Sequence, residues 1–486
     1  MQRKNKQFEE ILRRIRSKSM DLTERRLRFG SGMVAILYVR QLTDRVALAE
    51  QVIKPLMECD KSRDLTAADV VESVIFADDC QISTDTSQIE RHVLEGMTVL
   101  LFSEDSQYVI INLKQVEKRN TTEPVMTYTV RGPRDSLVEN LDSNLSLIRY
   151  RLQCEALRID MLRVGRRNHS KIAVIYFEDI ANSQTVAEIK KRIGAIDVDG
   201  LSSSGELQAY LLNSRISLFP QMGIVERSDM ACGALLEGKV VVLMDGSPWA
   251  LVAPKVFSEF LWSCDDFYQN RFISTFNRIL RIISLNLAFI VSSLYVAVVS
   301  YHSDALPGAY MIAIAQARAN VPFSAILEVL FIELIGEIIR ESLIRVPTKI
   351  GTAIGIVGAI IIGQAAVAAG VFSPLILIVI SLSLISSFVP ADYTIMDPFR
   401  VLKYLLILAT AMFGLYGFTL VIIFVITQLV STNTFGTPYM APVAPFKLRD
   451  AIKSIIYSKP STPLRPEFLR TRDNTRGPIP PRQGGS

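Results

Sequence analysis

The segment at residues 318–345 combines titratable side chains with a largely apolar composition. It is rich in Ile, Leu and Val, and it also carries Glu328, Glu333, Glu337, Arg340, Glu341 and Arg345. Glu333, Glu337 and Glu341 are four residues apart and therefore form one line on a helix. Charges at membrane depth must face protein or water. The line predicts a permeation path or a subunit contact if the segment spans a membrane, and a solvated face if it is an interfacial or re-entrant helix.

A second pattern follows at residues 350–371, where small residues recur every four positions. This face fits close helix packing and consists of Gly351, Gly355, Ala359 and Gly363. At about 100° per residue, the opposite face carries Val357, Ile361, Gln364 and Ala368. A ring of such residues around an oligomer axis predicts a hydrophobic gate, dry when narrow and conducting when widened. The alternative is that this face meets lipid or the adjacent span, with Gln364 bonded to a neighbouring helix.

Residues for catalysis or cofactor binding do not form a recognisable pattern. The sequence has no Walker motif, no GxGxxG and no nucleophile elbow. Glu237 and Asp245 fit a helix end and a turn better than an acid–base pair. The three histidines are far apart, which argues against a metal site. The five cysteines form no CxxC, so we expect no disulfides and a reducing compartment.

Hydropathy divides the chain after Arg281, because charges are frequent before it and long uncharged stretches follow. Residues 282–301 are long enough for one span. Residues 350–391 are enough for two, at about 350–371 and 375–391, with a turn at Ser373-Pro374. A further span lies within 404–446, where Gly414 and Gly417 mark a kink or tilt. We therefore expect four spans, or five if 318–345 crosses the membrane and 404–446 does not fold back on itself.

The ends of the chain indicate orientation. The N-terminal 18 residues lack the apolar core of a signal peptide, and Arg278 and Arg281 precede the first span. From Lys447 onward, nine Lys or Arg stand against three acids. We expect residues 1–280 and this tail to face the cytoplasm. A nucleic-acid partner is not expected, because the basic tail lacks interleaved aromatic residues.

The charged half shows α/β organisation, with short apolar runs alternating with helical patterns. Residues 33–42 resemble 171–180, and residues 92–102 resemble 234–244 at nearly the same offset. Each copy has a Leu-Glu-Gly helix end before a strand, where Gly suits a left-handed residue. These similarities predict two similar subdomains; the alternative is chance similarity between common strand–helix patterns. The predicted divisions are a charged N-terminal helix (1–29), two α/β subdomains (30–130 and 166–277), a connecting helix between them (131–165), a transmembrane domain (278–446) and a basic tail (447–486).

Long segments of this sequence are similar to the A subunits of GerA-type bacterial spore nutrient-germinant receptors. They are RGPRDSLVENLDSNLSLIRYRL (131–152), ERSDMACGALLEGKVVVLMDGSPWALVAP (226–254), IGIVGAIIIGQAAVAAGVFSP (354–374) and FGTPYMAPVAPF (435–446). The segments occur in order, and the resemblance runs from about residue 25 to 475.

The resemblance implies a non-enzymatic membrane protein of the spore inner membrane. It implies two partners, a transporter-like B subunit that holds the nutrient pocket and a lipoprotein C subunit. It also implies a homo-oligomer of A subunits that conducts ions when a nutrient binds, with the soluble domain facing the spore core. The residue patterns alone leave three functions open: a gated ion channel, a permease-like transport component with a soluble regulatory domain, and a passive scaffold.

Overall fold

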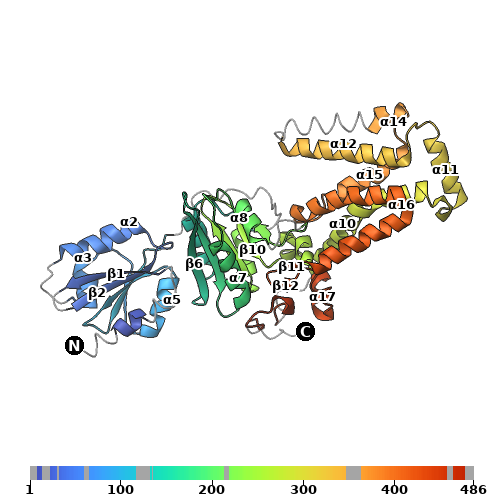
Figure 1. The fold of residues 1–486 in the computed structure, drawn as a ribbon. Helices are drawn as coiled ribbons and strands as arrows, with labels where there is room; N and C mark the ends of the chain where they lie inside the picture. Colours follow the sequence, from blue (N-terminus) through green and yellow to red (C-terminus); the bar gives the residue numbers. More distant parts are fainter. Residues whose placement is uncertain are drawn as a thin grey trace, which may run out of the picture.

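The structure is a computed structural model of the chain. It describes residues 8–13, 22–29, 32–59, 65–115, 132–133, 135–212, 218–345, 363–456 and 464–476. Two α/β units come first, and a helical region and a C-terminal tail follow them (Figure 1).

The first unit (residues 8–115) is built on a five-stranded sheet with the order β1-β2-β4-β5-β3, antiparallel throughout. Its strands are β1 Leu22–Phe29, β2 Gly32–Val39, β3 Cys80–Ser83, β4 Thr98–Phe102 and β5 Tyr108–Ile111. Its helices include α2 Arg45–Ala47, α3 Lys54–Glu58, α4 Ala67–Asp69 and α5 Ile89–Leu94. Both faces of β2 and β4 are covered by these helices and by residues 8–13, which explains their continuous apolar runs.

The second unit (residues 135–267) has the corresponding strand order, β6-β7-β9-β10-β8. Its strands are β6 Leu157–Val164, β7 Ser170–Phe177, β8 Gly223–Val225, β9 Val240–Met244 and β10 Ala250–Ala253. Helices α6 Leu141–Arg151 and α9 Ser228–Leu236 cover one face, and α7 Ser183–Gly194 and α8 Ser204–Leu211 cover the other.

The paired sequence segments occupy equivalent places in the two sheets. Residues 33–42 include most of β2 and residues 171–180 most of β7, each the second strand in its order. The predicted helix ends also correspond, since Gly96 follows α5 and Gly238 follows α9, both with φ +94°. An L side chain rarely adopts this conformation, so glycine fits both positions.

Two sequence predictions about helices hold only in part, since residues 8–13 are helical and α6 lies within the predicted connecting segment, but other residues of both segments form strands. Residues 22–29 belong to strand β1 and not to an N-terminal helix, and the connecting helix is confined to α6, because residues 157–164 form β6. Both strands lie at the edge of their sheets and carry charges, such as Arg26 in β1 and Arg158 in β6. Charges on an edge strand discourage pairing with other chains, but they also hide the alternating pattern that identifies a strand.

The helical region begins with α10 Arg271–Ser300 and continues through α11 Gly308–Arg318, α12 Ala325–Arg345, α14 Ala366–Ala368, α15 Pro374–Ser386 and α16 Met396–Ser431. Helix α10 packs against α12, α15 and α16. The order of an α/β region followed by a helical region agrees with the sequence prediction.

Helix α16 reverses direction at Gly414, which has φ +62° and ψ −142° inside the helix. A Cβ placed on Gly417 would lie 2.0 Å from the carbonyl oxygen of Ala409, a contact impossible in a straight helix. The two limbs, residues 396–413 and 415–431, therefore run back along each other (Figure 1). Gly414 and Gly417 mark a reversal, where the sequence suggested a kink or tilt.

By length and composition, two of the described helical segments could cross a membrane: α10 and residues 393–431. The second segment contains α16 and is therefore divided at Gly414 into the two limbs described above. The sequence predicted four or five spans. Helix α15 has 13 residues, or roughly 20 Å of length, against a bilayer core of about 30 Å. Helix α12 carries several charges, and the predicted span 350–371 lies largely outside the described residues.

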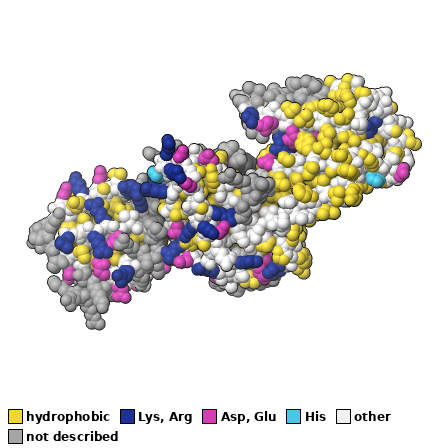
Figure 2. All heavy atoms as spheres, viewed as in Figure 1, with side chains coloured by type: hydrophobic (Ala, Val, Ile, Leu, Met, Phe, Trp, Pro, Cys, Tyr) yellow, Lys and Arg dark blue, Asp and Glu magenta, His cyan; other side chains and the backbone are white. Residues whose placement is uncertain are grey.

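Apolar side chains dominate the visible surface of the helical region, whereas charges are spread over the two α/β units (Figure 2). Exposed apolar residues of the helical region include Ile378, Val401, Met412, Tyr416 and Ile423. Such a continuous apolar surface indicates contact with lipid or with other protein chains.

The tail folds back onto the second unit in its described part. Helix α17 Leu448–Ile455 contacts the start of α10. Beyond it, Arg465 Nε donates to the carbonyl of Leu236 (3.0 Å), and the Arg472 amide donates to the carbonyl of Ile180 (2.9 Å).

Candidate functional site: buried ion pairs of the helical region

Glu333 lies at a point where four helices meet, and its side chain is fully buried. Ser292 of α10 donates to its Oε1 (2.6 Å), and Lys403 of α16 donates to its Oε2 (2.5 Å). The Lys403 ammonium is also 3.5 Å from the hydroxyl of Ser383 in α15. Each carboxylate oxygen therefore has a donor, as a charge removed from water requires.

Glu337 lies one turn farther along α12 and forms a second ion pair. The Nε–H of Arg400 in α16 is shared between the two carboxylate oxygens of Glu337, at 3.1 Å and 3.3 Å, and Nη2 donates a further hydrogen bond. Arg340 lies 3.6 Å from Glu337 and donates to the hydroxyl of Ser387 (2.7 Å). Arg400 also reaches Asp397 (3.1 Å), so this group extends toward the surface of the helical region.

Glu328 forms a third ion pair nearer the other end of α12. Its fully buried carboxylate lies 2.9 Å from Nη2 of Arg318, the last residue of α11. The backbone amide of Ser373 donates to its second oxygen (3.1 Å). Three carboxylates of α12 thus each meet a cation from another helix, and together these pairs join α10, α11, α12, α15 and α16.

The predicted acidic line divides in the structure. Glu333 and Glu337 face protein, whereas the side chain of Glu341 is 57 % exposed and pairs with Arg345 at 2.6 Å. Glu328 was named from the sequence but left outside the acidic line, and the partners Lys403 and Arg400 were not identified. A signal for the partners was present, because Arg400 and Lys403 are three residues apart just before an apolar segment and lie on one helix face.

The predicted pore and packing faces fall mostly on residues that the structure leaves undescribed. Val357, Ile361, Gly351, Gly355 and Ala359 lie outside the described residues. Three residues of these two faces are described, Gly363, Gln364 and Ala368, and all three are exposed in the single chain. Nothing lies within 4 Å of a Cβ built on Gly363.

A buried ionic cluster ties the second unit to the helical region. Asp266 is fully buried, with Arg281 Nη1 at 2.8 Å and Arg278 Nε at 3.1 Å from its Oδ2. Arg278 also donates to the backbone carbonyls of Lys453 (3.4 Å) and Ser454 (3.3 Å) in α17. The sequence treated these two arginines as charges flanking a span, but in the structure they bind the second unit and the tail together.

A cavity of about 590 Å³ lies between α9, strands β8 and β10, and the C-terminal tail. Its aromatic lining consists of Trp262, Phe267 and Tyr268, and its charged lining includes Glu237, Lys239, Glu259, Lys453, Arg465 and Arg476. The volume falls in the range of small-molecule sites.

Lys239 in this cavity is buried and lies 2.6 Å from Glu259 and 3.6 Å from Glu237. Burial alone would lower the pKa of Lys239, but the two carboxylates outweigh it and raise that pKa above its ordinary value. Lys239 is therefore held in its charged form.

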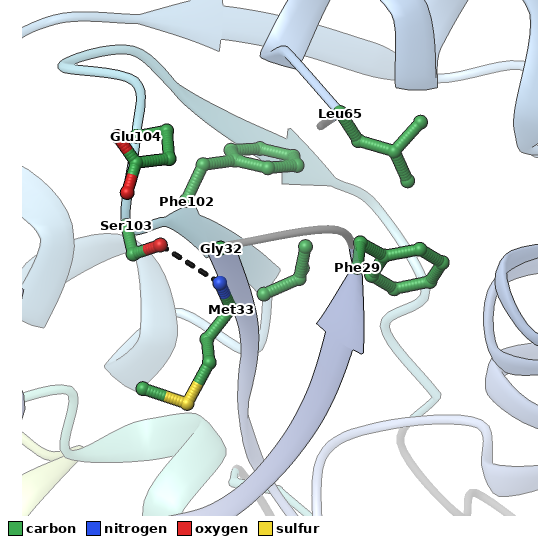
Figure 3. Close-up of a pocket in the computed structure, with 8 residues that line it drawn as sticks. Phe29, Gly32, Met33, Leu65, Phe102, Ser103 and Glu104 are labelled. Carbon is green, nitrogen blue, oxygen red and sulfur yellow. Dashed lines mark hydrogen bonds between the residues drawn. The ribbon is translucent and has the colours of Figure 1, made fainter. Parts of the chain in front are cut away.

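A much smaller cavity lies in the first unit, near the turn between β1 and β2. Its volume is about 10 Å³, room for about one water molecule. Phe29, Phe102 and Leu65 face it, and the Met33 amide donates to the Ser103 hydroxyl at its edge (2.7 Å; Figure 3). Despite the shared strand order, this place in the first unit offers no ligand-sized space.

Comparison with known proteins gives consistent matches. Residues 9–467 match the family model described as Bacillus/Clostridium GerA spore germination protein. Spore germination protein GerLA of Bacillus cereus is 34 % identical over 480 residues, covering 96 % of this chain and 97 % of that protein. Spore germination protein KA of Bacillus subtilis (strain 168) is 31 % identical over 464 residues, covering 94 % and 85 %.

Two further matches concern a membrane protein and a solved structure. The uncharacterized membrane protein YfkQ of Bacillus subtilis (strain 168) is 30 % identical over 441 residues, covering 90 % of this chain and 86 % of that protein. The crystal structure of the N-terminal domain of the A subunit of the Bacillus megaterium spore germinant receptor GerK3 is 23 % identical. The match covers 51 % of this chain and 94 % of the chain in that crystal structure, with a TM-score of 0.39.

Proposed function

The chain belongs to the Bacillus/Clostridium GerA spore germination protein family, and we propose that it is the membrane-bound A subunit of a nutrient-germinant receptor. Copies of the chain enclose an ion path that opens when the receptor binds a nutrient. The chain acts as a gated conductor and not as an enzyme, and it needs no cofactor.

The observation that carries this proposal is the distribution of charge in the helical region. The face of this region seen in Figure 2 is largely apolar, while Glu328, Glu333 and Glu337 lie inside with their cations. An apolar exterior suits lipid, and ionisable groups inside membrane helices typically mark ion or proton pathways. This arrangement supports a membrane protein in which the buried charges serve ion conduction as well as helix packing.

The receptor contains two further subunits under this proposal: a transporter-like B subunit that holds the nutrient pocket, and a lipoprotein C subunit. The complex lies in the inner membrane of the spore, with both α/β units and the tail facing the spore core. The tight contact of the tail with the second unit supports placing both on one side of the membrane.

The gate itself is the face formed by Val357, Ile361, Gln364 and Ala368, repeated around the oligomer axis. Gly351, Gly355, Ala359 and Gly363 pack each of these helices against its neighbours. The exposure of Gln364 and Ala368 in the single chain supports a contact supplied by other copies.

Reconstitution of the purified protein in liposomes tests the proposal. We expect ion flux without stoichiometric transport of a solute; flux that requires such a solute would instead favour a permease-like transport component. The Ile361→Ala variant should leak ions and trigger germination without nutrient. Leu377→Ala, in the partly buried face of α15, is the matched control and should only mildly destabilise. Equal, non-leaky behaviour of both variants at normal protein levels would overturn the gate assignment.

A further inference from the structure

Helix α17 presents an apolar face that nothing in the described chain covers. Leu448, Ile452, Ile455 and Ile456 are between 37 % and 62 % exposed. At about 100° per residue they fall on one side of the helix, whereas Asp450 and Ala451 are buried against the protein. A short helix of this kind is unstable alone in water, so its position depends on what both of its faces contact.

We propose that α17 and the first turns of α10 together form an interfacial anchor, with their apolar side chains inserted into the leaflet nearest the α/β units and their basic residues on anionic lipid headgroups. This inference rests on the proposed function insofar as it requires the helical region to lie in a membrane.

Exposed apolar side chains also occur on the first turns of α10, on the opposite side of that helix from Arg278. Phe272 and Phe276, in the first turns of α10, are 81 % and 65 % exposed. The two helices are fixed to each other, because Arg278 of α10 donates to the carbonyls of Lys453 and Ser454. The Trp262 indole also donates to the Ser454 carbonyl (3.0 Å). The exposed side chains of α17 are therefore held beside the helix that enters the apolar region, near the end of the second limb of α16 (Figure 1).

Charge on α17 matches an anionic membrane surface. Arg449 and Lys453 follow the apolar face along one edge of the helix, where Lys453 also borders the cavity. Lys447 precedes the helix and pairs with Glu467. The acid of the helix, Asp450, turns inward and accepts from the Glu467 amide (2.9 Å). Burial and the neighbouring Arg449 and Arg476 lower the pKa of Lys453, as expected where cations gather. An apolar face bordered by Lys and Arg is the pattern of a helix that lies in a lipid interface.

A lipid occupant explains both features at once. A second protein chain would need its own complementary apolar surface at this place, whereas the leaflet that surrounds α10 already continues past α17. The anchor would also link the bilayer to the second unit, since Arg278 bonds both Asp266 and the backbone of α17. A conformational change in the helical region would then be transmitted to the tail and to the cavity that the tail helps to close.

Depth-dependent quenching tests the proposal on the full-length protein, reconstituted in vesicles of phosphatidylcholine with or without phosphatidylglycerol. An environment-sensitive label is placed at Ile455→Cys, and in a separate sample at Tyr210→Cys, in a variant whose five native cysteines are Ser. Tyr210 of α8 matches Ile455 in exposure, 41 % for each. We expect the label at 455 to be quenched by a spin-labelled lipid and protected from iodide at least fivefold relative to the label at 210.

Three results decide the matter. Quenching of the label at 455 by lipid supports the anchor. The charge preference is supported if the Arg449→Gln/Lys453→Gln variant weakens this quenching only in vesicles that contain phosphatidylglycerol. Equal iodide access at 455 and 210 overturns it in favour of a solvated helix. Protection from both iodide and lipid quencher overturns it in favour of a protein contact. Because ion flux is measured separately in the same vesicles, failure of the anchor with intact flux leaves the proposed function standing.

Discussion

Two ion pairs, one in the second unit and one in the helical region, differ in their surroundings. In the second unit, Arg166 and Asp197 pair while their side chains remain 70 % and 65 % exposed. In the helical region, Glu333 and Lys403 pair with 0 % and 4 % exposed. Exposed pairs contribute about 0–1 kcal/mol at most, whereas removing one partner of a buried pair costs about 3–5 kcal/mol. The comparison teaches that only the inner pairs have the energy to determine which helices meet.

The largest effect is expected from Lys403→Met, which leaves the fully buried Glu333 without its cation. The variant should lose about 3–5 kcal/mol of stability, seen as a large drop in the thermal unfolding midpoint in detergent and as reduced assembly. The Glu333→Gln/Lys403→Met double variant is the control, because it removes both charges from the same place. Recovery of most of the lost midpoint in the double variant is expected; equal loss in single and double variants would contradict a role for the pair.

Asp266→Asn is expected to have the next largest effect. It removes the carboxylate that Arg278 and Arg281 share at the junction of the second unit with α10. An uncompensated arginine in a buried site should cost about 3 kcal/mol and loosen the junction. Limited proteolysis should then cut between the second unit and α10 several-fold faster than in the wild type. The control variant Asp304→Asn, at an exposed position after α10, should be cleaved at the rate of the wild type.

Sequence reasoning located the general fold but not the pairing of helices. The change from α/β to helical structure was visible because charge disappears after Arg281. Strands β1 and β6 were missed because edge positions permit charges, such as Arg26 and Arg158, that break the strand pattern. The reversal at Gly414 was left open, because two apolar limbs of a hairpin have the same hydropathy as one long helix.

Only the acidic residues of the candidate site could be predicted from the sequence, and their basic partners could not. The spacing of Glu333 and Glu337 marked them, because two acids one turn apart in an apolar segment require partners. Their partners Lys403 and Arg400 lie 70 and 63 residues away. No local spacing rule connects residues so distant. Glu341 follows the same spacing but lies near the end of α12, where it is exposed and pairs within its own helix.

A smaller, pH-dependent effect is expected at Lys239. Its folded-state pKa is raised, so its pairing with Glu259 stabilises the fold below the ordinary lysine pKa of about 10.4 and is lost as pH rises through the raised value. Unfolding midpoints measured from pH 8 to 12 should fall more steeply in the wild type than in Lys239→Met/Glu259→Leu, which lacks the pair. Parallel curves would show that this buried pair behaves like an exposed one.

The smallest effect is expected from Arg166→Ala, which removes the solvent-exposed pair of the second unit. Arg166 Nε donates to Asp197 Oδ1 at 2.6 Å, which is good hydrogen-bond geometry, but both groups are open to solvent. Water and salt replace the lost contact, so the unfolding midpoint should stay within experimental error, and raising the salt concentration should not separate the variant from the wild type. Geometry and exposure make opposite predictions at this pair. A loss as large as that of Asp266→Asn would mean that close geometry, and not removal from water, separates the strong pairs of this protein from the weak ones.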